Sequence, residues 1–273
     1  MVSHTTRSAQ ALHRPDPRCD DVQRPLRFVV VGTQRSGTTY LRQCLDSHPQ
    51  VDCRGELFAR SYGKSDGYHA YRSSSALRQL GHYAWRGAQV ASFMNATLGR
   101  AEMGVEAIGF KLMRSHVRRV PYEYSMLLPQ LRRRGYRVIH VIRKNLLRVL
   151  VSRRTALARG QFHARTALPA VKITLPIATL LQELEKVAAE NRFWATATSG
   201  AFERLEVEYE QFVADQQTQS QRMLGFLKVN RSLPLHSPHK QVNRAPLAHI
   251  VGNYTEVAAT LAGTHYAQFL EEE

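Results

Sequence analysis

The chain has 273 residues, 43% of them hydrophobic, which is enough to bury the core of one large α/β domain. Lys and Arg number 38 against 22 Asp and Glu, so the formal net charge is +16 and we expect an anionic partner: a nucleotide, a nucleic acid or an acidic membrane surface. The apolar runs are far shorter than the roughly 20 residues of a membrane span, and the cysteines lack metal-ligand spacing, so neither a transmembrane anchor nor a disulfide framework is expected.

The first 25 residues are polar, contain three prolines and lack the apolar run of a secretory signal. We therefore predict a disordered tail over residues 1–25 and a single domain over residues 26–273. The cysteine pattern also fits a reducing compartment, so the expected location is the cytoplasm.

Short apolar runs alternate with helical patterns along the rest of the chain. The first half predicts a strand at Leu26–Val31, a helix at Tyr40–Leu45, a strand at Gln50–Cys53, a long surface loop at Ala59–Ser75, a helix at Ala76–Arg100 interrupted at Gly81 and Gly87, and a strand at Ala107–Leu112. The second half predicts a helix from Pro121 to Arg134 that Gly135 ends, a strand at Tyr136–Ile142, a helix at Leu146–Arg159, a loop at Gly160–Leu175, a helix from Pro176 to about Ser199, a strand at Leu205–Tyr209, and helices at Gln211–Leu227 and Leu247–Leu261. This alternation predicts a P-loop-like single α/β domain with a central parallel β-sheet flanked by helices on both faces.

The segment Gly32–Thr39 reads GTQRSGTT and lies between a predicted strand and a predicted helix. Its spacing, G-x-x-x-x-G-x-T, is typical of a phosphate-binding loop, because glycines allow a tight turn while backbone N–H groups at the helix N-terminus bind an anion. Thr38 stands where a nucleoside-triphosphate loop needs Lys. The strand at 138–142 is followed by Arg143 where P-loop ATPases and kinases place the Asp that holds Mg²⁺. These departures predict a group transfer without a metal ion.

The segment Arg35–Leu41 resembles the 5′-phosphosulfate loop of sulfotransferases that use 3′-phosphoadenosine 5′-phosphosulfate (PAPS), whose usual form is x-[KR]-S-G-T-T-x-L. The run Val141–Ser152 resembles the second motif of that family, in which an Arg after a strand and a Ser on the next helix hold the 3′-phosphate. Its Arg-to-Ser spacing is similar to that of bacterial nodulation-factor and trehalose sulfotransferases, which favours the bacterial carbohydrate-type branch. The resemblance implies that PAPS is bound by Arg35, Ser36, Gly37, Thr38, Thr39, Tyr40, Arg143 and Ser152.

Two further segments supply candidate catalytic residues. The segment His48–Phe58 resembles the bacterial branch, in which a Glu after the second strand is the base, so Glu56 is expected to take the proton of the acceptor hydroxyl. The alternative is that Glu56 is a surface or ion-paired residue next to Arg54 or Arg60. Lys111, in a segment that also resembles the family, is expected either to stabilise charge at the site, as Arg35 would, or to extend its ammonium group to solvent.

Other polar residues give weaker signals. Glu208-Tyr209-Glu210 resembles a Tyr-Glu pair of the family and is interpreted as structural. The histidines show no ligand spacing and no visible partner, so they are interpreted as ordinary structural or surface residues, and no metal site is expected. These histidines are His69, His116, His140 and His163.

The resemblance implies a sulfotransferase that moves a sulfuryl group from PAPS to a hydroxyl of a carbohydrate or other small hydroxylated acceptor, by in-line displacement with a Glu base. The expected acceptor is a sugar or glycolipid, no nucleic acid is expected as a partner, and the basic charge allows peripheral contact with an anionic membrane. Two alternatives stay open: a metal-dependent P-loop kinase, and a basic nucleic-acid-binding protein, for which no recognition helix or aromatic platform is visible.

Overall fold

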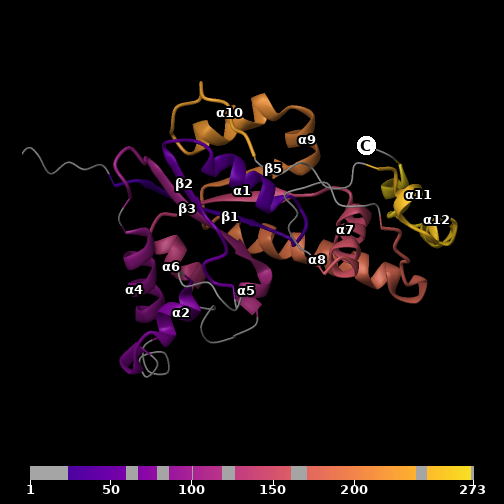
Figure 1. Cartoon of the computed structure of the whole chain (residues 1–273), viewed down its shortest axis with the longest axis horizontal. Helices are drawn as coiled ribbons and strands as arrows, with labels where there is room; N and C mark the ends of the chain where they lie inside the picture. The colour runs from indigo at the N-terminus through magenta and orange to yellow at the C-terminus, as the bar shows by residue number, and fades with distance from the viewer. Residues whose placement is uncertain are drawn as a thin grey trace, which may run out of the picture.

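The computed structural model describes residues 24–59, 67–78, 86–99, 101–118, 127–160, 171–237 and 245–271. Within this part of the chain, five parallel strands form one sheet in the order β2-β3-β1-β4-β5 (Figure 1). The strands are β1 (Leu26–Gly32), β2 (Val51–Arg54), β3 (Ala107–Met113), β4 (Arg137–Ile142) and β5 (Arg204–Glu208). The strand predictions are confirmed to within a residue or two at each end.

The strand order creates a crevice at one edge of the sheet. The connection that leaves β1 runs to β2 on one side, whereas the connection that leaves β4 runs to β5 on the other side. Neighbouring strands whose connections diverge in this way leave an opening outside their carboxyl ends, which is where α/β sheets bind ligands. Gly32 pairs with Val141 in the sheet, so the segments that follow both strands begin side by side.

Helices cover both faces of the sheet (Figure 1). One face carries α1 (Thr38–Asp46), α9 (Tyr209–Ala214) and α10 (Gln216–Phe226). The opposite face carries α2 (Tyr68–Ser73), α4 (Arg86–Leu98), α6 (Leu127–Arg133) and α8 (Leu180–Thr198), and α5 (Arg114–Arg118) follows β3 directly. Because apolar side chains line both faces, β3 is buried along its whole length. The predicted fold class, a P-loop-like α/β domain with helices on both faces, is confirmed.

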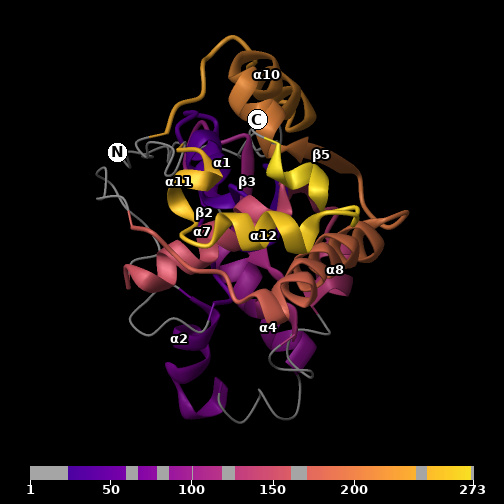
Figure 2. The same cartoon turned by 90° about the vertical axis from the view of Figure 1, so that its right-hand side faces the viewer.

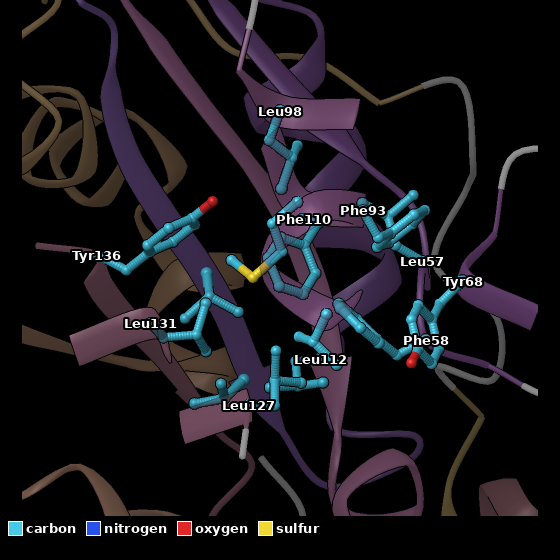
Figure 3. Packing of buried hydrophobic residues seen from close by; sticks show 14 of the residues in the cluster. Leu57, Phe58, Tyr68, Phe93, Leu98, Phe110, Leu112, Leu127, Leu131 and Tyr136 are labelled. Carbon is cyan, nitrogen blue, oxygen red and sulfur yellow. The ribbon is translucent and has the colours of Figure 1, made fainter. Parts of the chain in front are cut away.

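Aromatic rings fill the core beneath the α4 face (Figure 3). Phe58 lies 5.5 Å from Tyr68, 5.4 Å from Phe93 and 5.6 Å from Phe110, measured between ring centroids. Offset and edge-to-face contacts at such distances stabilise a core beyond the area they bury. Tyr68 is fully buried on α2, so the segment predicted as a surface loop at 59–75 contains a helix packed into the core, which corrects that prediction.

A third apolar cluster covers the end of the sheet near its carboxyl edge (Figure 2). It is formed by α7 (Leu146–Ala158), η1 (Ile177–Thr179), α8 and the C-terminal elements α11 (Leu247–Ile250), α12 (Tyr254–Leu261) and η2 (Ala267–Leu270). Asn253 pairs through its side-chain amide with both backbone groups of Leu175, at 3.0 and 2.9 Å. This packing holds α7, which follows β4, against the body of the domain.

Two helices predicted as continuous are each divided. The helix predicted at 211–227 breaks at Asp215, whose Oδ1 accepts a hydrogen bond from Thr218 N (3.0 Å) and caps α10. The helix predicted at 247–261 breaks before Asn253, whose side chain binds another segment. Gly87, predicted to interrupt a helix, lies inside α4. Gly135 ends its helix with φ +66°, as predicted.

Some predictions lie outside the described residues. Among the predicted elements, these are residues 1–23 of the N-terminal tail, the helix start at Pro121, the helix interruption at Gly81, and residues 161–170 of the predicted loop. Among the single residues, they are Arg60 and His163. In the part that is described, no helix is both long enough and apolar enough to cross a membrane.

Candidate active site

The loop Thr33–Gly37 joins β1 to α1 at the crevice between β1 and β4. Arg35 and Gly37 both have positive φ, at 73° and 90°. A Cβ atom at Gly37 would lie 2.1 Å from the ring of Tyr209, so this position needs glycine for its conformation and for its space. The N–H groups of the first turn of α1 have no acceptor inside the helix, and Gly37 has no side chain to cap them. This turn can therefore bind an anion.

The hydroxyl groups of the loop are turned toward the protein. Ser36 is fully buried and its Oγ donates to Thr33 O (2.8 Å), which closes the turn. Thr38 is also buried and its Oγ1 faces Met113 Sδ at 4.0 Å. Thr39 Oγ1 accepts a hydrogen bond from Lys111 Nζ at 2.8 Å. The loop therefore offers mainly its backbone N–H groups to a ligand.

Side chains from the segment after β4 and from α7 contact this loop. Arg35 Nε donates to Ser152 Oγ (3.0 Å), although the two residues are 117 positions apart in the sequence. Arg143 Nη1 donates to Arg35 O at 3.4 Å. The two sequence motifs, the loop after β1 and the Arg and Ser around α7, thus form one cluster.

The turn that carries Arg143 is fixed by the neighbouring β5–α9 turn. The carboxylate of Glu210 accepts hydrogen bonds from the backbone N–H groups of Lys144 (3.1 Å) and Asn145 (3.2 Å). Asn145 in turn caps α7 by accepting from Arg148 N (3.0 Å). The segment 208–210, interpreted from sequence as structural, therefore does position the site.

Two guanidinium groups lie close together in this cluster. The guanidinium carbon of Arg143 lies 5.0 Å from the centre of the Tyr209 ring, and the Arg143 side chain is only 13% exposed. Burial lowers the pKa of Arg35, and the nearby charge of Arg143 lowers it further. Glu210 Oε1 lies 3.9 Å from Arg143 Nε. An arrangement of like charges in a half-buried crevice favours an anionic ligand between them.

A second cluster lies on the other side of β1, where β2 and β3 end. Glu56 follows β2, Lys111 is on β3, and His116 is on α5. Lys111 Nζ lies 2.7 Å from Glu56 Oε1, and His116 Nε2 lies 3.3 Å from Glu56 Oε2. Lys111 and His116 are each 7% exposed, whereas Glu56 is 30% exposed. Because Lys111 also contacts Thr39, this cluster is joined directly to the loop after β1.

The environment of Glu56 keeps its carboxylate ionised. Burial raises the pKa of Glu56, but the hydrogen bond from His116 and the charge of Lys111 outweigh burial and hold the pKa far below its usual range. The alternative pairing with Arg54 is not found, because Arg54 binds Asp52 at 2.9 Å. The alternative in which Lys111 extends to solvent is wrong, since its side chain is buried.

Sequence reasoning missed His116, which was interpreted as an ordinary residue without a partner. The signal that would have found it is its place directly after β3, at the same sheet edge as the other site residues. Two other histidines considered from the sequence have different contacts: His69 packs against Tyr68, and His140 is fully buried in β4. Burial, together with the charge of Arg204, lowers the pKa of His140 to about 4.

A cavity of about 660 Å³ opens beside the first turn of α1. Tyr40, α10 and the segment 231–237 line it. The Tyr40 ring packs edge-on against Phe212, 5.9 Å between centroids, which fixes the ring at the cavity wall.

A model of the sulfotransferase family matches residues 27–232, three quarters of the chain. The chain belongs to the sulfotransferase family. Solved structures similar to this sulfotransferase include one from Alicyclobacillus acidocaldarius, with 13% identity, a TM-score of 0.48 and coverage of 82% of this chain and 88% of that one. The sulfotransferase domain of the Synechococcus PCC 7002 olefin synthase is 20% identical, with a TM-score of 0.43 and coverage of 77% and 76%. The sulfotransferase domain of the curacin biosynthetic pathway is 14% identical, with a TM-score of 0.47 and coverage of 89% and 82%. No curated protein sequence matches the chain significantly.

Proposed function

We propose that this sulfotransferase transfers a sulfuryl group from PAPS to a hydroxyl of a small acceptor. The proposal rests mainly on one observation: Arg35 is hydrogen-bonded to both Arg143 and Ser152, beside an N-terminus of α1 that no side chain caps. PAPS carries two separate anionic ends, a 5′-phosphosulfate and a 3′-phosphate. The residues fit such a molecule, because the N–H groups of the loop and Arg35 suit one end, while Arg143 and Ser152 suit the other.

The cavity beside Tyr40 is the place we assign to the adenosine. Its volume of about 660 Å³ exceeds the size of one nucleoside, and a tyrosine ring on its wall suits stacking of an adenine base. In this assignment the 5′-phosphosulfate extends from the cavity to the loop Thr33–Gly37. The lining by Gln216 and Ser220 supplies polar groups for a base or a ribose.

Glu56 is the proposed base, and its low pKa is compatible with that role. An alcohol is a weak acid, but its proton becomes strongly acidic as the oxygen bonds to sulfur. A carboxylate of low basicity can therefore accept the proton late in the displacement. Lys111 and Arg35 supply positive charge, Lys111 beside Glu56 and Arg35 beside the phosphate that leaves as adenosine 3′,5′-bisphosphate. In this proposal the protein's own cations do the work that a metal ion does in P-loop kinases.

The proposed acceptor, a sugar, a glycolipid or another hydroxylated small molecule, rests on the resemblance of the Arg143-to-Ser152 segment to bacterial carbohydrate-type sulfotransferases. The basic charge of the chain would help an acceptor in an anionic membrane to approach. No observation on the described residues favours the kinase or the nucleic-acid-binding alternative. Turnover with ATP and Mg²⁺ in the absence of PAPS would overturn the proposal in favour of a kinase.

The test compares two nucleotides that differ only in the 3′-phosphate. Calorimetry of the wild-type protein should show that adenosine 3′,5′-bisphosphate binds about 100-fold more tightly than adenosine 5′-phosphate, since a bidentate charge-assisted contact contributes on the order of 2–3 kcal/mol. Arg143→Ala should abolish most of this preference. The matched control is Arg154→Ala, which removes the same type of side chain from the neighbouring helix α7, where Arg154 pairs with Glu183. A preference that survives Arg143→Ala would contradict the assignment of the 3′-phosphate to Arg143.

A further inference from the structure

The ring of His116 is held at both of its nitrogens. Nδ1 lies 3.3 Å from the backbone nitrogen of Met113, and Nε2 lies 3.3 Å from Glu56 Oε2. The backbone N–H can only donate, so Nδ1 must accept and carries no proton. In the neutral ring the proton is then on Nε2, where it can be donated to the carboxylate of Glu56. The backbone of β3 thus selects one tautomer of His116.

This tautomer leaves His116 without a nitrogen that could serve as a base. To take up a proton, Nδ1 would have to give up the hydrogen bond from Met113, and Nε2 already carries a proton. The contact with Glu56 is therefore a fixed donation. His116 differs in this from Lys111, whose ammonium group can rotate and is shared between Glu56 and Thr39.

The two donors bind different oxygens of one carboxylate. Lys111 binds Oε1 and His116 binds Oε2, so the plane of the carboxylate is fixed and it cannot exchange one oxygen for the other without breaking both contacts. Lys111 and His116 are each only 7% exposed. Burying these polar groups costs desolvation energy, which an ion pair on the surface would not lose. Buried titratable groups gathered around a carboxylate at the ligand-binding edge of a sheet are a typical feature of a functional site.

We propose that His116 is a positioning residue for the sulfuryl transfer: as the Nε2–H tautomer, it holds Glu56 Oε2 so that the carboxylate keeps one orientation while it accepts the proton of the acceptor hydroxyl. The role rests on the proposed function, in which Glu56 is the base. In that reaction the acceptor O–S bond forms, the bond from sulfur to the leaving phosphate oxygen breaks, and the hydroxyl proton moves to Glu56.

The first test does not depend on turnover. A long-range ¹H–¹⁵N NMR spectrum of the full chain at neutral pH, assigned by comparison with His116→Gln, should show His116 as the neutral Nε2–H tautomer. A proton on Nδ1, or on both nitrogens, would overturn the proposal.

The second test separates positioning from packing. His116→Gln keeps an N–H donor near the place of Nε2, whereas His116→Leu keeps volume and removes the donor. With PAPS and an acceptor, kcat should fall on the order of 100-fold in His116→Leu and only a few-fold in His116→Gln, because a misplaced catalytic group costs about that factor. The affinity for adenosine 3′,5′-bisphosphate should be unchanged in both variants, since His116 does not belong to the Arg35 cluster.

The matched control is His249→Leu, the same change at an exposed position on α11. Equal kcat values for the Gln and Leu variants, or wild-type kcat in His116→Leu, would overturn the positioning role. Absence of any PAPS turnover or nucleotide binding in the wild type would instead overturn the proposed function, and the NMR test would still decide whether His116 donates to Glu56.

Discussion

At the scale of single residues, Glu56 is the group whose change should separate chemistry from nucleotide binding. Glu56→Gln keeps the shape but replaces one acceptor oxygen by an NH₂ group, which faces the donor of Lys111 or of His116. We expect kcat to fall by about 10²–10⁴-fold, the usual contribution of a general base. Steady-state kinetics measures this, and calorimetry should show unchanged binding of adenosine 3′,5′-bisphosphate. An unchanged kcat would exclude Glu56 as the base.

The same substitution has a pH-dependent effect on stability. Because Lys111 and His116 depress the pKa of Glu56 in the folded chain, the unfolded chain binds a proton at higher pH than the folded chain does. The stabilisation from Glu56 is therefore present above its unfolded pKa of about 4.3 and is lost as the pH falls below it. Urea unfolding at several pH values should show that, below about pH 4.3, the free energy of unfolding falls more steeply with decreasing pH in the wild type than in Glu56→Gln. Parallel curves would contradict the ion pair.

At the scale of elements, the loop between β1 and α1 depends on the β5–α9 turn. Gly37→Ala adds a methyl group 2.1 Å from the Tyr209 ring at a residue with φ 90°, so we expect destabilisation on the order of 1–3 kcal/mol and weaker nucleotide binding. The double variant Gly37→Ala with Tyr209→Ala removes the clash and leaves the backbone strain. Thermal unfolding of both, with Tyr209→Ala as the reference, should therefore show a smaller effect of Gly37→Ala without the ring. Equal effects in both backgrounds would mean that the ring contact is unimportant.

The predictability of the elements follows the range of the interactions that define them. The strands and the glycine-containing turn after β1 were predicted because their signals, apolar runs and glycine spacing, are local. The break before Asn253 was missed because it depends on a contact with Leu175, 78 residues away, whereas the break at Asp215 was missed although its capping contact with Thr218 is local. Tyr68 was assigned to a surface loop because nothing local shows the aromatic partners that bury it.

The residues of the candidate site were likewise predicted where a local motif marks them and missed where a contact between distant segments defines them. Arg35, Glu56, Lys111 and Arg143 were predicted through motifs, and the structure brings them to one edge of the sheet. The contact of His116 with Glu56 depends on the pairing of β2 with β3, which no single segment reveals.

At the scale of the whole molecule, protonation of His140 should make the free energy of unfolding depend on pH. Its ring is fully buried in β4, and burial lowers its pKa to about 4. The folded chain therefore favours the neutral ring, so stability is full above the unfolded pKa of about 6.5 and falls as the pH drops toward 4. Between pH 6.5 and pH 4 the free energy of unfolding should fall on the order of 2 kcal/mol less in His140→Leu than in the wild type. Urea unfolding across that range measures it, and an unchanged pH dependence would contradict the buried neutral histidine.

The strand order separates the residues proposed to bind the nucleotide from those proposed to act on the acceptor. Groups proposed to grip the nucleotide follow β1 and β4, those proposed to act on the acceptor follow β2 and β3, and the loop after β1 touches both through Arg35 and Thr39. Under the proposed function, sequence changes in the segments around β2 and β3 would alter the choice of acceptor and leave the residues proposed to hold the nucleotide in place.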